Sequence, residues 1–176
     1  MKISSVYDLK ALVRDVPNFP KKGIIFKDIT PILKQPEALQ FAADELSNHV
    51  RSTRPNQIVG IESRGFIFSP ILAYQLKAGF IPIRKSGKLP AKTIKTSYSL
   101  EYGESELEIH EDAILEGMRV AIVDDLLATG GTAKAAIDLV EKLGGEVVAI
   151  VFLIELGFLK GREKLAGYNV FSLIQY

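Results

Sequence analysis

Apolar residues follow two alternating patterns along the chain. In some stretches they recur at the three- and four-residue spacing of a helix that packs against a core. These predicted helices are Val6–Val16, Pro36–Val50, a segment that ends near Lys77, and Ala133–Leu143. Between the later ones lie short, nearly continuous apolar runs that predict buried strands: Gln57–Glu62, Gly79–Lys85, Arg119–Asp125, Glu146–Leu156 and Asn169–Tyr176. Their alternation with helices predicts an α/β fold with a central, mostly parallel sheet flanked by helices.

Two prolines and one alternating segment add detail to this pattern. Pro70 is expected to delay or kink its helix, because proline has no amide hydrogen and clashes with the preceding turn. Pro82 places its strand near a sheet edge or a bulge. Polar and apolar residues alternate over Ser97–Tyr102 and again over Ser105–His110, which predicts a β-hairpin.

Composition narrows the possible functions. The chain has 176 residues, of which 47% are hydrophobic and 24% charged, as expected of one globular domain. Its net charge of +1 provides no field that would attract nucleic acid or an anionic membrane. The lack of cysteine excludes disulfides, thiolate metal sites and a cysteine nucleophile, and it fits a reducing compartment.

Neither a membrane span nor a secretion signal is indicated by the hydropathy pattern. The longest apolar run, Val147–Ile154, is too short to cross a bilayer, and the N-terminal segment lacks the apolar centre of a signal peptide. We therefore expect a cytoplasmic protein with no membrane and no nucleic-acid partner.

The most informative stretch of sequence is Val120–Ala136. It begins as a buried strand, runs into Asp124 and Asp125, and continues through a Thr-Gly-Gly-Thr turn into a helix. Carboxylates are costly to bury unless something pairs with them. In parallel sheets, ligands bind beyond the carboxyl ends of the strands, so we expect a ligand here.

The chemistry of this turn favours a sugar phosphate. Gly130 and Gly131 let backbone amides close around an oxyanion, and the following helix directs its positive end toward the same point. Two aspartates would repel a phosphate, but they suit the hydroxyls of a ribose or the water shell of Mg²⁺. For the glycine turn alone, a simple helix cap remains an equally good interpretation.

Two common nucleotide-binding motifs are missing. No G-x-G-x-x-G follows a strand, which argues against a dinucleotide-dependent oxidoreductase. Gly60 and Gly65 have the spacing of a P-loop, but Phe66 stands where the lysine would be required. A P-loop ATPase is therefore also excluded.

Val120–Thr132 resembles the corresponding segment of the adenine phosphoribosyltransferase family, which belongs to the type I phosphoribosyltransferases. Further segments resemble this family in the same order: Phe19–Leu33, Gly60–Phe68, Ile83–Pro90, Ser97–Gly103 and Gly161–Leu165. The resemblance implies a single domain over residues 1–176, with a small hood formed by about residues 1–34 and a flexible hairpin lid over residues 85–102. It also implies a homodimer.

The same resemblance implies a reaction: adenine and 5-phosphoribosyl-1-pyrophosphate give AMP and pyrophosphate in purine salvage, with Mg²⁺ bound mainly through the sugar diphosphate. No protein residue is expected to hold the metal on its own. Water must be excluded from the activated sugar, which gives a lid a purpose.

The family pattern assigns roles to matching residues. The resemblance implies that the 5-phosphate is bound by Ala128, Thr129, Gly130, Gly131 and Thr132. It also implies that Asp124 and Asp125 bind the ribose hydroxyls and that Leu126 lies against the base. Ser63 and Arg64 match a pyrophosphate-binding turn, with a cis peptide expected between them. Arg84, Lys85 and Lys88 would meet the pyrophosphate when the lid closes, Arg84 across a dimer interface. Adenine would lie under Ile25, Phe26 and Lys27, and Glu101 would accept its proton, with Tyr102 alongside.

Some of these roles depend on the resemblance alone. Without it, Lys85 and Lys88 would be assigned to a solvated surface and Glu101 to an exposed strand position. Two other functions stay open: transfer to a different base, and a phosphoribosyl-pyrophosphate-sensing transcription regulator. The regulator would need a DNA-reading module, whereas only a short helix precedes Phe19.

Overall fold

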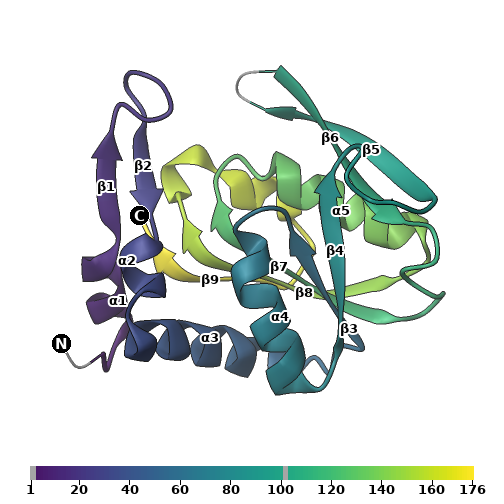
Figure 1. Ribbon diagram of the computed structural model, residues 1–176, viewed down its shortest axis with the longest axis horizontal. Helices are drawn as coiled ribbons and strands as arrows, with labels where there is room; N and C mark the ends of the chain where they lie inside the picture. Colours follow the sequence, from purple (N-terminus) through teal and green to yellow (C-terminus); the bar gives the residue numbers. More distant parts are fainter. Residues whose placement is uncertain (1–2, 101–102) are drawn as a thin grey trace. The chain divides into compact units, whose positions relative to one another are not determined.

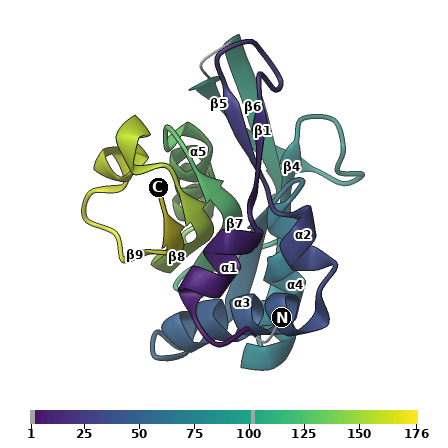
Figure 2. The ribbon, with the colours of Figure 1, turned by 90° about the vertical axis from the view of Figure 1, so that its left-hand side faces the viewer.

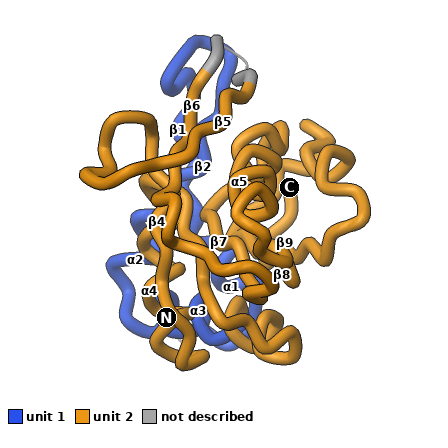
Figure 3. The backbone as a smooth tube through the Cα atoms, turned by 90° about the vertical axis from the view of Figure 1, so that its right-hand side faces the viewer, with its two compact units in different colours: residues 1–45 blue, residues 46–176 orange. Residues whose placement is uncertain are grey.

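The computed structural model describes residues 3–100 and 103–176 of the chain. It contains two compact units, Met1–Glu45 and Leu46–Tyr176, coloured separately in Figure 3. No helix in the described ranges is long and apolar enough to cross a membrane.

The first unit combines short helices with a hairpin. Its elements are α1 (Val6–Leu12), β1 (Arg14–Pro17), β2 (Ile25–Asp28) and α2 (Thr30–Leu33), and the long helix α3 (Pro36–Arg51) begins in it. The side chain of Ser5 accepts the Asp8 amide while Asp8 bonds back to the Ser5 amide, so α1 starts in a capping box. The β1–β2 hairpin is not predicted by the sequence, because its four-residue strands are too short for an alternating pattern to be recognised.

The second unit is built on a seven-stranded sheet with the order β5-β6-β4-β3-β7-β8-β9. The strands are β3 (Gln57–Ile61), β4 (Gly79–Lys85), β5 (Thr93–Leu100), β6 (Gly103–His110), β7 (Arg119–Leu127), β8 (Glu146–Glu155) and β9 (Val170–Gln175). Strands β4, β3, β7, β8 and β9 run parallel, and the β5–β6 hairpin joins the end of β4 in antiparallel fashion. The fold class predicted from the sequence is confirmed.

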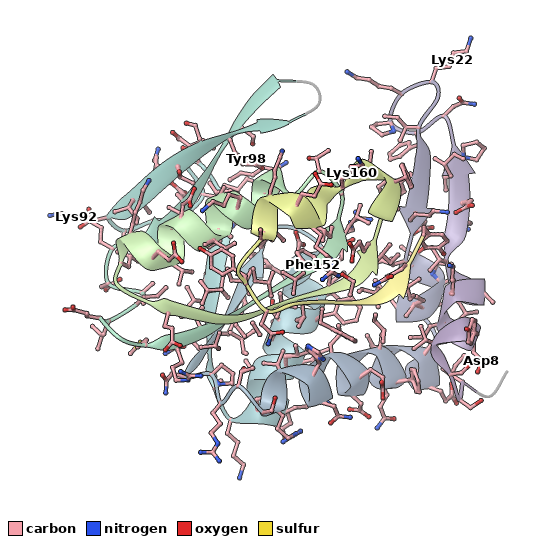
Figure 4. All side chains as sticks on the ribbon, turned by 180° about the vertical axis from the view of Figure 1, so that it is seen from behind. Asp8, Lys22, Lys92, Tyr98, Phe152 and Lys160 are labelled. Carbon is pink, nitrogen blue, oxygen red and sulfur yellow. The ribbon has the colours of Figure 1, made fainter. Side chains whose placement is uncertain are left out.

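Helices cover both faces of the parallel strands. In Figure 2 the strand β7 lies between α4 (Gly65–Leu76) and α5 (Gly131–Lys142), and Figures 1 and 4 show these helices in front of opposite faces. The short 3-10 helices η1 (Gly157–Leu159) and η2 (Gly161–Leu165) follow β8. The core beneath α5 includes Phe152, labelled in Figure 4, which is completely buried.

The two prolines behave differently. Pro82 pairs with Gly60 of β3 on one side. On the other side β6 pairs with β4 only at Arg84 and Lys85, so β4 has no neighbouring strand there at Pro82, as predicted for a strand edge. Pro70 does not delay its helix, since α4 begins at Gly65 and contains it. The packing of the buried side of α4 against β3 holds the helix together despite the missing amide.

The hairpin predicted around Gly103 is present and longer than predicted. Eight residue pairs join β5 and β6, from Thr93–His110 to Leu100–Gly103. β5 packs along α5, where Ile94 and Tyr98 are partly buried against the core (Figure 4). The base of the predicted lid is therefore anchored on the sheet and on α5.

Candidate active site

The residues predicted to bind the sugar diphosphate collect at one edge of the sheet. Ser63 and Arg64 follow the end of β3, Arg84 and Lys85 end β4, and the acidic pair of Asp124 and Asp125 lies near the end of β7. Because β3, β4 and β7 are parallel neighbours, their carboxyl ends form a continuous edge.

The acidic pair and the start of α4 are in direct contact. An ion pair of 3.0 Å joins the Arg64 guanidinium to the Asp125 carboxylate. A Cβ atom at Gly65 would lie 2.9 Å from an Asp124 carboxylate oxygen and equally close to the Val123 carbonyl oxygen. Only glycine at position 65 allows this approach, which places two motifs distant in sequence next to each other.

The environment of the acidic pair opposes its negative charge. Burial raises the pKa of Asp124 well above its ordinary value, and the neighbouring Asp125 charge raises it further. Burial also raises the pKa of Asp125, although Arg64 acts in the opposite direction. The pair is therefore suited to a ligand that brings hydroxyl donors or positive charge to it.

Two helices present their N-terminal ends at this edge. In the described part of the chain, no side chain caps the first amides of α4 or α5, in contrast to α1. Uncapped amides and the helix dipole together favour an anion. The edge thus offers two anion sites, one at the start of α4, which precedes the acidic pair in the sequence, and one at the start of α5, which follows it.

The turn before α5 packs against a later part of the chain. Gly130 adopts the left-handed conformation, with a φ of 78°, and a Cβ there would overlap the Gly161 carbonyl oxygen. A Cβ at Gly161 would overlap the Ala128 carbonyl oxygen in return. Arg162 secures this segment by donating to Glu155 at 3.0 Å and to the Val170 carbonyl at 2.8 Å. The sequence pattern gave Gly161 no role of its own.

A partly buried carboxylate, that of Glu62, binds the cations at the end of β4 and in the loop that follows it. The Glu62 carboxylate accepts hydrogen bonds from Arg84 Nε at 3.0 Å and from Lys88 Nζ at 2.8 Å. It also accepts the Lys85 amide at 3.3 Å. Burial alone would raise the pKa of Glu62, but the donors outweigh it and lower the pKa to about 2.

A second carboxylate, that of Glu108, holds the backbone of the loop that follows β4. Glu108 on β6 is only 2% exposed, and its carboxylate accepts the amides of Lys88 and Leu89, both at 2.8 Å. Burial acts to raise the pKa of Glu108, but these backbone donors lower it overall. Neither Glu62 nor Glu108 was identified from the sequence as a functional residue.

The cis peptide expected between Ser63 and Arg64 lies one residue earlier, between Glu62 and Ser63. The Glu62 amide still donates to the Ile83 carbonyl of β4 at 2.9 Å, so the strand pairing continues up to this residue. Arg64 already has helical backbone angles as the N-cap of α4. The chain therefore turns at the Glu62–Ser63 bond, between the strand pairing of Glu62 and the helical backbone of Arg64.

Comparisons with known proteins agree with this geometry. The sequence profile of the phosphoribosyl transferase domain matches residues 28–174. An adenine phosphoribosyltransferase of Halothermothrix orenii is 60% identical over 168 residues, which cover 96% of this chain and 99% of the relative. The chain belongs to the adenine phosphoribosyltransferase family.

Solved structures of this family have the same fold. The enzyme from Thermoanaerobacter pseudethanolicus superimposes with a TM-score of 0.95 at 53% identity, over 98% of this chain and 100% of the other. The Saccharomyces cerevisiae enzyme, in complex with an imino-altritol bisphosphate and adenine, gives a TM-score of 0.91 at 44% identity, over 96% and 97% of the two chains. The family assignment and the transferase class inferred from the sequence are confirmed.

The remaining residues of the adenine phosphoribosyltransferase pattern lie as follows. Leu126 is partly buried on β7. In the first unit, Ile25, Phe26 and Lys27 lie on β2, where Ile25 is 55% exposed and Lys27 forms a 2.6 Å ion pair with Asp15. Phe26 packs edge-on against Phe19 at a centroid distance of 5.2 Å. Glu101 and Tyr102 lie outside the described residues, so their roles remain predictions.

Proposed function

We propose that this site transfers the 5-phosphoribosyl group of 5-phosphoribosyl-1-pyrophosphate to adenine, forming AMP and pyrophosphate in purine salvage. The observation that carries the proposal is the acidic pair placed between two uncapped helix starts. A ribose with a phosphate at one end and a diphosphate at the other has the complementary distribution of anions and hydroxyls.

The sugar binds through β7 and the turn that follows it. Amides of Ala128, Gly130 and Gly131, with the hydroxyls of Thr129 and Thr132, hold the 5-phosphate at the start of α5. Asp124 and Asp125 accept hydrogen bonds from the ribose hydroxyls, and Leu126 packs against the base. The hydroxyl donors compensate the charges that burial disfavours in the acidic pair.

The leaving group binds at the ends of β3 and β4. Ser63 and Arg64 hold the diphosphate at the start of α4, while Arg84, Lys85 and Lys88 approach it from the β4 side. When the bond between C1 and the diphosphate oxygen breaks, the ribose gains positive charge and the diphosphate negative charge. The carboxylates and the cations stabilise these two charges respectively.

The base completes the reaction by bonding to C1 through N9. In this proposal Glu101 accepts the proton that N9 loses, and Tyr102 assists it. Backbone groups of Ile25, with Phe26 and Lys27 beside them, read the edge of adenine as part of a hood over about residues 1–34 of the single domain 1–176. The hairpin over residues 85–102 acts as the lid.

Mg²⁺ would be held at this site mainly by the sugar diphosphate. In residues 3–100 and 103–176, no group of three or more metal-ligating side chains could hold an ion, so most ligands must come from the substrate. The donor chemistry fits, because Asp124 and Asp125 offer hard oxygen atoms to the water shell of such an ion and gain from a nearby positive charge. The ion supplies additional stabilisation of charge on the diphosphate.

The proposed enzyme is a cytoplasmic homodimer with no membrane or nucleic-acid partner. Phe66, Pro70 and Tyr74 recur every four residues along one side of α4, and the Tyr74 side chain is 87% exposed. Phe80 continues this apolar face, lying 5.8 Å from the Phe66 ring. A second copy would cover this face. Sedimentation velocity should detect a dimer, and Tyr74→Glu should convert it to a monomer.

Base selection provides the direct test of the proposal. We expect kcat/KM for adenine to exceed that for hypoxanthine and guanine by roughly a thousandfold, because a 6-oxo group leaves acceptors unpaired in a closed site. The three purines are compared at one Mg²⁺ concentration with the same sugar diphosphate. Equal use of hypoxanthine or guanine would reject adenine as the specific base while leaving phosphoribosyl transfer in place.

A further inference from the structure

Two carboxylates hold a single loop in different ways. We call the segment from Arg84 to Leu89 the basic loop. Glu62 binds its side chains, through Arg84 and Lys88, whereas Glu108 binds its backbone, through the amides of Lys88 and Leu89. The Arg84 guanidinium additionally donates to the Lys88 carbonyl at 3.0 Å, which links the two ends of the loop.

Glu62 occupies the position where a bound anion would compete with it. It directly precedes the Ser63–Arg64 turn at the start of α4, and only 10% of its side chain is exposed. Its two partners are more open, with 32% of the Arg84 side chain and 47% of the Lys88 side chain exposed. An anion that reaches the turn therefore finds these two cations accessible but already paired with a carboxylate.

We propose that Glu62 is a positioning residue that substitutes for the diphosphate in the empty enzyme. It holds Arg84 and Lys88 before the substrate binds, releases them to the diphosphate, and takes them back as pyrophosphate leaves. The inference rests on the proposed function, in which both cations contact the diphosphate. Glu108 keeps its contacts throughout, because its partners are amides that the anion does not need.

This competition has a measurable consequence for product release. Because bound pyrophosphate must displace Glu62, the carboxylate weakens pyrophosphate binding and accelerates its departure. Glu62→Gln removes the charge but preserves the shape, so Arg84 and Lys88 become available to the anion. We expect inorganic pyrophosphate with Mg²⁺ to bind this variant about 3- to 10-fold more tightly, the range expected for losing exposed ion pairs. Both kcat and KM for the sugar diphosphate should fall.

Three further variants separate this role from general effects. Glu146→Gln removes the same charge at the opposite edge of the sheet, where Glu146 pairs with Arg119 at 2.9 Å, and should leave pyrophosphate affinity unchanged. Glu108→Gln loosens the loop backbone and should weaken binding. Glu62→Asp keeps the charge but shortens the side chain. It should still bind more tightly than wild type, because freeing the cations causes the gain.

The experiment is calorimetric titration of the full-length enzyme with inorganic pyrophosphate and Mg²⁺, combined with steady-state kinetics. Thermal unfolding establishes that each variant is folded. Unchanged or weaker pyrophosphate binding by folded Glu62→Gln or Glu62→Asp would overturn the inference while leaving the proposed function standing. Failure of the wild-type enzyme to bind pyrophosphate at all would overturn both.

Discussion

The acidic pair on β7 and the two glutamates around the basic loop belong to the same sheet but have opposite electrostatic environments. Asp124 and Asp125 are buried with few donors, and their pKa values are raised. Glu108 is buried and Glu62 is partly buried, yet several donors surround both and their pKa values are lowered. In the proposed function the first pair is completed by the ligand, whereas the carboxylates of the second pair already have donors within the protein. The direction of the pKa shift thus distinguishes carboxylates that bind from carboxylates that organise.

The largest expected effect is on catalysis by the acidic pair. Asp124→Asn and Asp125→Asn should each lower kcat/KM for the sugar diphosphate by about 100-fold or more, because an amide cannot replace the carboxylate charge near the developing ribose cation. The fold should persist, as judged by circular dichroism. Asp138→Asn on α5 removes a carboxylate that pairs with the exposed Lys134 at 2.6 Å; it is the matched control and should keep its activity. Full activity in both site variants would remove the acidic pair from the mechanism.

Loss of the Glu108 carboxylate is expected to affect stability. Glu108→Gln should lower the free energy of unfolding by about 1–3 kcal/mol, because the amide cannot accept all the backbone donors that the carboxylate now satisfies. Urea denaturation provides the measurement. Glu106→Gln, two residues earlier on β6 with a side chain 39% exposed, should leave stability nearly unchanged. Equal effects of the two substitutions would mean that Glu108 does not organise the loop.

The pH dependence of stability should separate the two groups by sign. Asp124 has a raised pKa in the folded state, so its favourable contribution exists below its ordinary pKa of 3.8 and is lost as pH rises. Asp124→Asn should therefore gain stability relative to wild type from about pH 4 upward. Glu62, lowered from 4.5 to about 2, stabilises the fold above pH 4.5 and loses this contribution on acidification. Glu62→Gln should accordingly be less stable than wild type at neutral pH. Urea titrations at several pH values test both signs, and a common sign would contradict the comparison.

The smallest expected effect concerns access to the basic loop. Trypsin should cleave after Lys85 and Lys88 about 2- to 5-fold faster in Glu108→Gln than in wild type, because cleavage needs local opening of the loop. Pyrophosphate with Mg²⁺ should protect both bonds in wild type. Mass spectrometry of timed digests identifies the cleaved bonds, and identical rates with and without ligand would argue against closure of a lid here.

Much of the second unit follows from its sequence for simple physical reasons. The runs that became β3, β7 and β8 are apolar almost throughout, which is required of strands covered on both faces. Once these strands are parallel, the residues after Ile61 and around Asp124 must meet at one edge. The edge of the sheet that carries the candidate site could therefore be located from the sequence alone.

The supporting contacts could not be predicted in the same way. Glu108 lies in an alternating strand and would be expected on the solvent side, but the basic loop folds over it and leaves it 2% exposed. Glu62 finds its partners at the end of a neighbouring strand and in the loop that follows it, and no local spacing encodes that pairing. Long-range contacts of loops depend on the whole fold, so periodicity along the chain does not reveal them.

The packing of Gly130 against Gly161 has a consequence for how the enzyme becomes functional during its synthesis. The ribosome releases the turn at Gly130 before Gly161, and the turn is closed on one side by that later backbone. A nascent chain that already contains both aspartates and the whole glycine turn still lacks one wall of the proposed phosphate site. If the proposed site binds the sugar phosphate, it is completed only after η2 has been synthesised and has packed against the turn.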